Sequence, residues 1–181
     1  MHMYLIVGLG NKGKEYEGTR HNVGFLLLDT LQKKYDFPAF TPSKKHASLI
    51  SEGMLHETKT ILAKPQTFMN ASGKAVQSLL PKLSLGDPKL SLVVIHDDID
   101  IPIGKIKISE NRGSAGHKGV DSSIQALGTK NFTRIRIGIQ PTKGKPDNTE
   151  TFVLKPFLSG EKKVLVSCID TAMQNIIELV K

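Results

Sequence analysis

The apolar positions of this chain follow two periods, and together they predict alternating strands and helices. Short apolar or alternating runs predict strands over residues 4–7, 47–50, 60–63, 90–95, 101–108 and 132–139, with a turn at Glu52 and Gly53. Apolar residues at spacings of three and four predict helices over about 22–35, 72–80, 117–127 and 161–180. No internal repeat or linker divides the chain, so we expect a single domain over residues 1–181.

The last predicted helix has the clearest apolar stripe, formed by Leu165, Ile169, Ala172, Met173, Ile176 and Val180. Cys168 lies in the same helix and is the only cysteine, so we expect a core thiol and no intramolecular disulfide. This cysteine usage fits a reducing cytoplasm. The N-terminus has no basic segment or apolar signal run, and no apolar stretch is long enough to span a bilayer. We therefore expect a cytoplasmic protein that does not bind membranes.

The whole chain has a formal net charge of +8, and most of this positive charge lies in one segment. Nine basic residues and only two acidic residues, Glu110 and Asp121, lie between positions 105 and 145, which gives this segment a net charge of +7. The basic residues are Lys105, Lys107, Arg112, Lys118, Lys130, Arg134, Arg136, Lys143 and Lys145. Such clustering points to a polyanionic partner, and nucleic acid is the leading candidate. The alternative is a basic surface that serves only solubility.

A glycine-rich turn follows the first strand. Gly8, Gly10 and Gly13 match the dinucleotide-binding fingerprint, which requires a helix directly after the last glycine to receive the pyrophosphate. Here a short polar segment follows instead, and helical spacing resumes only near Asn22. No acidic residue about 20 positions further on ends a second strand to hold a ribose. The spacing therefore disfavours a dinucleotide site.

Three polar clusters fall where predicted strands end. They are Asn11 with His21, Asn70 alone, and His96 with Asp97 and Asp98. A histidine beside a carboxylate is a common general base, and asparagine amides can hold a carbonyl or an oxyanion. No serine elbow is present, so a water nucleophile is favoured over a covalent one. The alternative for the two asparagines is a turn residue and a helix cap.

The acidic run at Asp97, Asp98 and Asp100 raises the possibility of a metal nuclease, because hard cations prefer oxygen ligands. Consecutive strand residues point to opposite faces, however, which makes Asp97 and Asp98 poor joint ligands. The histidines also lack the paired spacing of a zinc site. A nuclease of this kind would cleave phosphodiesters and lose activity with a chelator.

Five segments of the chain, at 8–25, 64–73, 95–108, 113–124 and 132–139, strongly resemble bacterial peptidyl-tRNA hydrolase, and the similarity covers nearly the whole sequence. The resemblance implies one α/β domain with a mixed, twisted central sheet flanked by helices. It also implies an esterase without metal or cofactor that recycles peptidyl-tRNA dropped by stalled ribosomes. Such enzymes are usually monomers, and no stable protein partner is expected.

The resemblance also implies residue roles. His21 resembles the catalytic base, and Asp97 resembles the carboxylate that orients it. Asn11 looks like a contact to the peptide end or the terminal nucleotide, and Tyr16 looks like part of the site for the ester-linked tRNA end. Phe68 and Asn70 resemble positions that hold substrate, with Asn70 aimed at the scissile carbonyl and its water.

The basic segment at 105–145 would then bind the phosphates of the acceptor stem, with Lys105, Lys107 and Arg134 among the expected contacts. Lys118 departs from the pattern, because many family members have asparagine there. Lysine only donates hydrogen bonds, so we expect Lys118 to meet phosphate rather than to order water. A non-catalytic RNA-binding relative, like the chloroplast splicing factors that resemble this family, is the second hypothesis. The chain retains the polar site residues of the enzyme family, which favours the enzyme; they are Asn11, His21, Asn70 and Asp97.

Overall fold

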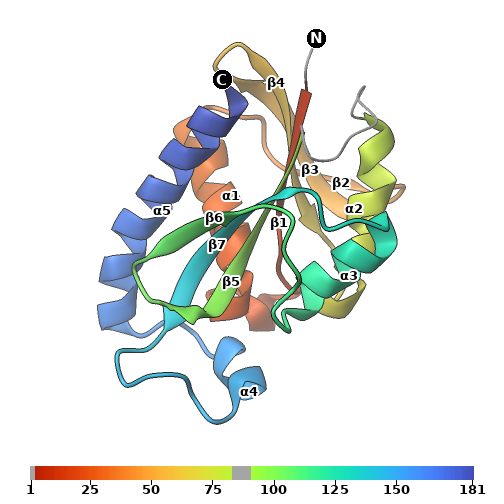
Figure 1. The fold of residues 1–181 in the computed structure, drawn as a ribbon. Coiled ribbons are helices and arrows are strands. Elements are labelled where there is room, and N and C mark those ends of the chain that lie inside the picture. The colour runs from red at the N-terminus through yellow and green to blue at the C-terminus, as the bar shows by residue number, and fades with distance from the viewer. Residues whose placement is uncertain (1–2, 83–90) are drawn as a thin grey trace.

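The computed structural model describes residues 3–82 and 91–181, which form one sheet with helices on both faces (Figure 1). The strands are β1 (Met3–Gly8), β2 (Thr41–Ser43), β3 (Ser48–Leu55), β4 (Thr58–Pro65), β5 (Leu92–Pro102), β6 (Ile106–Ser109) and β7 (Thr133–Gln140). Their order across the sheet is β2-β3-β4-β1-β5-β7-β6. The four strands β4, β1, β5 and β7 are parallel, whereas β2, β3 and β6 run antiparallel to their neighbours. The mixed central sheet is therefore confirmed.

The helices are α1 (Val23–Lys34), α2 (Ser72–Leu79), α3 (Lys118–Leu127), α4 (Thr149–Val153) and α5 (Ser159–Val180). Short 3-10 turns are η1 (Lys14–Tyr16), η2 (Arg20–Asn22), η3 (Met69–Ala71) and η4 (Leu80–Lys82). In Figure 1, α1 and α5 cover one face of the sheet, and α2 and α3 cover the other. The short helix α4 lies beyond the end of the sheet, apart from both layers.

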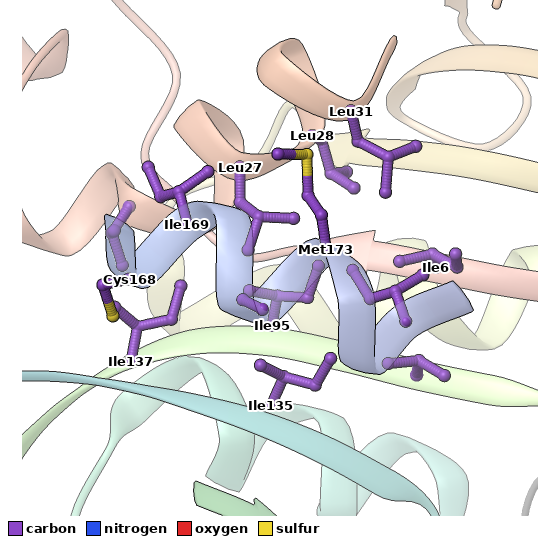
Figure 2. Packing of buried hydrophobic residues seen from close by; sticks show 14 of the residues in the cluster. Ile6, Leu27, Leu28, Leu31, Ile95, Ile135, Ile137, Cys168, Ile169 and Met173 are labelled. Carbon is purple, nitrogen blue, oxygen red and sulfur yellow. The ribbon is translucent and has the colours of Figure 1, made fainter. Parts of the chain in front are cut away.

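Alternating residues of the central strands supply two cores. On β1, Ile6 packs with α1 and α5, whereas Leu5 and Val7 pack on the side of α2 and α3. Figure 2 shows Met173 and Ile169 of α5 between the leucines of α1 and the isoleucines of the sheet. Burial of each such side chain stabilises the fold by roughly 1.5–3 kcal/mol.

The predicted stripe of α5 is confirmed, because all six of its residues are buried. Cys168 is buried in the same core, and burial raises the pKa of its thiol to about 11. A thiol with so high a pKa is protonated at neutral pH and is therefore a poor nucleophile. The prediction of a core cysteine is confirmed.

Two predicted boundaries were wrong. The strand β3 continues through Gly53 to Leu55, and the turn lies at 56–57, because Gly53 packs under the ring of Phe37 and does not reverse the chain. The strand expected over 101–108 is two strands, since β5 extends to Pro102 and β6 begins after Gly104, whose φ is 82°. Positive φ is accessible to glycine at little cost, so the chain reverses there. Residue 90, expected to begin a strand, lies outside the described residues.

Within residues 3–82 and 91–181, no helix has the length and apolar character needed to cross a membrane.

Candidate active site

The position of β1 in the sheet determines where polar side chains can gather. It pairs in parallel with β4 on one side and β5 on the other, so the carboxyl ends of all three strands lie at one edge of the sheet. The connection after β1 leads towards β2, β3 and β4, whereas the connection after β5 leads to β6 and β7 on the other side, which creates a crevice of the kind that binds ligands in open α/β sheets. Asn11 follows β1, Met69 follows β4, and Asp97 lies on β5.

Glycines allow the segment that carries His21 to lie directly on these strands. A Cβ atom at Gly8 would collide with the carbonyl oxygen of Gly24 at the start of α1. A Cβ atom at Gly24 would lie 2.6 Å from the backbone nitrogen of Leu9 and 2.7 Å from the carbonyl oxygen of Ile95. The glycines therefore permit close backbone packing beside His21. The turn η1 follows the third fingerprint glycine where a dinucleotide site would need a helix.

Asn11 is buried and its side chain has a fixed orientation. The Asn22 side chain brackets the Asn11 backbone, accepting from its N–H at 2.9 Å and donating to its carbonyl at 2.9 Å. Asn11 Oδ1 accepts from the backbone N–H of Met69 at 2.8 Å. Because the oxygen is used in this way, the Nδ2 group of Asn11 is the part of the amide left to donate to a ligand.

His21 and Asp97 form a close pair, as the family resemblance implied for a base and its carboxylate. His21 Nδ1 donates to Asp97 Oδ1 at 2.8 Å, which leaves Nε2 on the opposite edge of the ring with its lone pair free. Burial alone would raise the pKa of Asp97, but interactions with His21 and His117 outweigh burial and hold that pKa well below its usual range. Asp97 is therefore a carboxylate at neutral pH and can stabilise an imidazolium on His21.

His117, which the sequence analysis did not single out, is a second partner of the same oxygen. Its Nε2 donates to Asp97 Oδ1 at 2.9 Å, and its Nδ1 accepts from the backbone N–H groups of Gly119 and Val120 at 3.2 Å each. His117 thus caps the N-terminus of α3. The ring thus accepts at one nitrogen from the helix start and donates its other N–H to the carboxylate. In the sequence, the position of His117 at the predicted start of a helix was the only indication of this capping role.

His96 lies behind the pair. Its Nδ1 donates to the backbone carbonyl of Asp97 at 2.7 Å, and its ring meets that of His117 edge-on, with centroids 4.7 Å apart. Burial and the nearby His117 hold the pKa of His96 well below its ordinary value. His96 does not line the cavity described below, although the sequence grouped it with Asp97. Asp98, the next residue of β5, accepts from Arg136 Nε at 2.8 Å and also lines that cavity.

A cavity of about 480 Å³ opens in front of His21. It is lined by Asn11 and His21, by residues 68–70, 97–100 and 114–118, and by Lys145, Thr149, Glu150, Val153 and Leu154. Six predicted site residues thus meet in one place, namely Asn11, His21, Phe68, Asn70, Asp97 and Lys118. Tyr16 lies in η1 and is not among the described residues that line the cavity.

The predicted phosphate contacts divide into two groups. Lys105 and Lys107 are exposed, and neither has an ion pair among the described residues. Lys118 is exposed at the rim of the cavity, where its ammonium binds the carboxylate of Glu150 at 2.7 Å. Arg134 differs from the prediction, because only 2% of it is exposed and its guanidinium donates to two loop carbonyls, at positions 112 and 113. Arg134 supports that loop and does not face solvent.

Among residues 3–82 and 91–181, one group of side chains has the spacing of metal ligands. His21, Asp97 and His117 each place one potential ligand atom within 4.8 Å of the others. In this structure both imidazoles donate their hydrogens to the same carboxylate oxygen. A metal ion would have to displace both hydrogen bonds, since the remaining nitrogen of His117 caps α3. The arrangement fits a hydrogen-bonded trio better than a preformed metal site.

The fold and the site together define an α/β protein with a histidine–carboxylate pair of the type used in general-base hydrolysis. The sequence matches the family described as peptidyl-tRNA hydrolase over residues 5–181, and the chain belongs to this family of hydrolases. The resemblance found from the sequence motifs is confirmed.

Relatives match along almost the entire length. The chain is 43% identical to the peptidyl-tRNA hydrolase of Thermodesulfovibrio yellowstonii, over 98% of this chain and 92% of that protein. It is 41% identical to the peptidyl-tRNA hydrolase of Aquifex aeolicus, over 100% of this chain and 92% of that protein. The crystal structure of peptidyl-tRNA hydrolase from Acinetobacter baumannii superposes with a TM-score of 0.88 at 31% identity, covering 98% of this chain and 88% of that one.

Proposed function

We propose that this chain hydrolyses the ester bond between peptide and tRNA in peptidyl-tRNA released from stalled ribosomes. It acts as a cytoplasmic monomer, without metal or cofactor. The observation that carries the proposal is the 2.8 Å bond from His21 Nδ1 to Asp97, which leaves Nε2 free beside a cavity. The names of the relatives support the substrate.

In the first step, His21 Nε2 accepts a proton from a water molecule as the water oxygen attacks the ester carbonyl. Asp97 stabilises the imidazolium that forms. General-base catalysis of this kind contributes about 10²–10⁴-fold to the rate. Protonation of His117 at Nδ1 would break its bonds to the Gly119 and Val120 N–H groups at the start of α3.

The attack places negative charge on the former carbonyl oxygen. Asn11 Nδ2 and the exposed amide of Asn70 both belong to the cavity and are the donors proposed to stabilise that oxyanion. As the intermediate collapses, the bond from carbon to the ribose oxygen breaks, and His21 returns its proton to that oxygen. The products are a peptide carboxylic acid, which loses its proton to solvent, and a tRNA with a free ribose hydroxyl.

The remaining contacts divide between the two parts of the substrate. The exposed Phe68 ring, with Lys12 Nζ 5.6 Å from its centroid, offers a stacking surface at the mouth of the cavity. Lys105 and Lys107 would bind acceptor-stem phosphates, which give affinity without sequence preference. Tyr16 lies outside the cavity and would contact the 3′ end of the tRNA from there.

The test is release of intact tRNA from a purified peptidyl-tRNA by wild type and by His21→Ala. We expect the variant to lose about 10²–10⁴-fold in turnover, while its affinity for deacylated tRNA stays close to wild type. An excess of chelator should leave wild-type turnover unchanged. His56→Asn is the matched control, because it removes an exposed imidazole from a turn with positive φ that asparagine tolerates.

Retention of more than about a third of wild-type turnover by His21→Ala would exclude His21 as the base. Wild-type binding of tRNA without ester cleavage would favour the non-catalytic RNA-binding hypothesis. Loss of activity with the chelator would contradict the metal-independent mechanism.

A further inference from the structure

Arg20 directly precedes His21, yet its side chain turns away from the cavity and is 2% exposed. Nη1 donates to the carbonyl oxygens of Lys155 at 3.0 Å and Phe152 at 3.4 Å. Nη2 donates to the Glu161 carboxylate at 2.6 Å. The Phe152 ring lies 4.1 Å from the guanidinium carbon. One buried cation thus holds three partners that are far from it in the sequence.

The backbone joins the same two segments. Thr19 and Pro156 form an antiparallel bridge, and the N–H of Arg20 donates to the Lys155 carbonyl at 3.2 Å. The segment that carries His21 is therefore attached to the chain that leaves α4.

This attachment matters because α4 and the residue after it form a wall of the cavity. The lining residues from this region are Thr149, Glu150, Val153 and Leu154. The last carbonyls of a helix lack partners within the helix, and a cation is favourable there. Arg20 binds the Phe152 carbonyl at this end of α4. The carboxylate that binds Arg20, that of Glu161, also accepts from the N–H of Leu158 at the start of α5.

We propose that Arg20 is a positioning residue, which fixes the α4 wall of the cavity at a set distance from the base His21. The inference rests on the proposed function, because the wall matters for catalysis only if it holds the substrate. A lysine could not replace the arginine, since one ammonium cannot span acceptors in two directions and stack on a ring. His21 keeps its own bond to Asp97, so loss of Arg20 releases the wall and leaves the base in place.

The first experiment compares Arg20→Lys with wild type under saturating single-turnover conditions. Misplacement of bound substrate by about 1 Å can cost roughly 10²-fold, so we expect the rate to fall by about 10- to 100-fold. The affinity for deacylated tRNA should stay within about twofold, since the exposed lysines are unchanged. The matched control is Lys34→Ala, which removes an exposed ion pair between α1 and Asp170 of α5 and should not alter the rate.

Two NMR signals separate movement of the wall from damage to the base. In Arg20→Lys, the Val153 and Leu154 methyl resonances should shift, while the low-field resonance of the His21 Nδ1 proton should persist. In Arg20→Ala, added guanidinium ion should restore part of the rate, because the truncation leaves space for it. If that variant does not fold, Glu161→Gln provides a milder test, with a smaller rate loss in the same direction.

An unchanged rate in Arg20→Lys would overturn the proposal. So would loss of the Nδ1 resonance together with the rate, which would make Arg20 a support of His21 itself. If wild type fails to cleave peptidyl-tRNA, the proposed function falls, and the methyl resonances still decide whether Arg20 positions the wall.

Discussion

His96→Asn should change how the stability of this protein depends on pH. The wild-type ring is buried, its Nδ1 donates to the Asp97 carbonyl at 2.7 Å, and its Nε2 has no hydrogen-bond partner among the described residues. Protonation of Nε2 would place an unpaired cation in the interior, near Arg134 and the ring of His117. Asparagine keeps an N–H donor close to the position of Nδ1 and removes the titrating nitrogen.

The sign and size of the effect follow from proton linkage. Burial holds the pKa of folded His96 well below the ordinary value of about 6.5, at which the unfolded chain titrates. Below that pH the unfolded chain binds a proton that the folded chain excludes, so stability falls as the pH falls. Between pH 7.5 and 5.5, this one group should lower the free energy of unfolding by about 1.4 kcal/mol. Asp97 has a lowered pKa and contributes its own acid sensitivity only below about pH 4.

The assay is urea unfolding of wild type and His96→Asn at several pH values in this range. The variant loses packing contacts at every pH, so only the change in the difference between the two proteins is informative. Their free energies of unfolding should converge by about 1.4 kcal/mol on going from pH 7.5 to 5.5. Parallel pH profiles would show that folded His96 takes up a proton readily, and the argument from its burial would fail.

Four further substitutions test the site. Asp97→Asn should lower turnover by about 10²–10⁴-fold in single-turnover release of tRNA, because an amide cannot stabilise imidazolium on His21; turnover within threefold of wild type would contradict the pairing. Lys118→Ala should make the slope of log K for tRNA against log salt concentration shallower by about 0.7–0.9, with little change in turnover at saturating substrate. Glu150→Gln should raise the affinity for tRNA, because it frees the Lys118 ammonium from its ion pair. An unchanged slope in Lys118→Ala would assign that lysine to its ion pair alone. In His117→Asn, the asparagine can still cap α3 but is too short to keep the bond to Asp97. Turnover should therefore fall about tenfold, while the free energy of unfolding, measured with urea, should fall by less than about 1 kcal/mol. Wild-type turnover in this variant would show that the bond from His117 to Asp97 has no catalytic role.

Much of the fold follows from local patterns. The alternation of β7 and the stripe of α5 each identify an element, because one face of a strand or helix must be covered. Local patterns placed Asn11 and Asp97 near strand ends, and the family resemblance implied the pairing of His21 with Asp97; the adjacency of β1 and β5 in the sheet brings the three together. The turn at 56–57 was missed because Gly53 resembles a turn residue although it serves packing.

The missed features depend on segments far apart in the chain. The alternation of β7 places Arg134 on a polar face, but the loop at 110–116 covers that face and binds its guanidinium. His117 resembles an ordinary residue before a helix until the fold brings it to Asp97. Arg20 is one of 25 basic residues in the sequence, and only the tertiary structure surrounds it with carbonyls and a carboxylate.

The separation of the reacting groups from the α4 wall has a consequence for protein engineering. Asp97 lies on β5, which β1 and β7 hold in register on either side, and His21 lies in η2 and is hydrogen-bonded to Asp97. The segment at 141–151 contributes cavity surface but no strand, and it ends just before the residues that Arg20 binds. We therefore expect changes of loop length or composition between positions 141 and 148, before α4 begins, to alter this side of the cavity without moving His21 or Asp97.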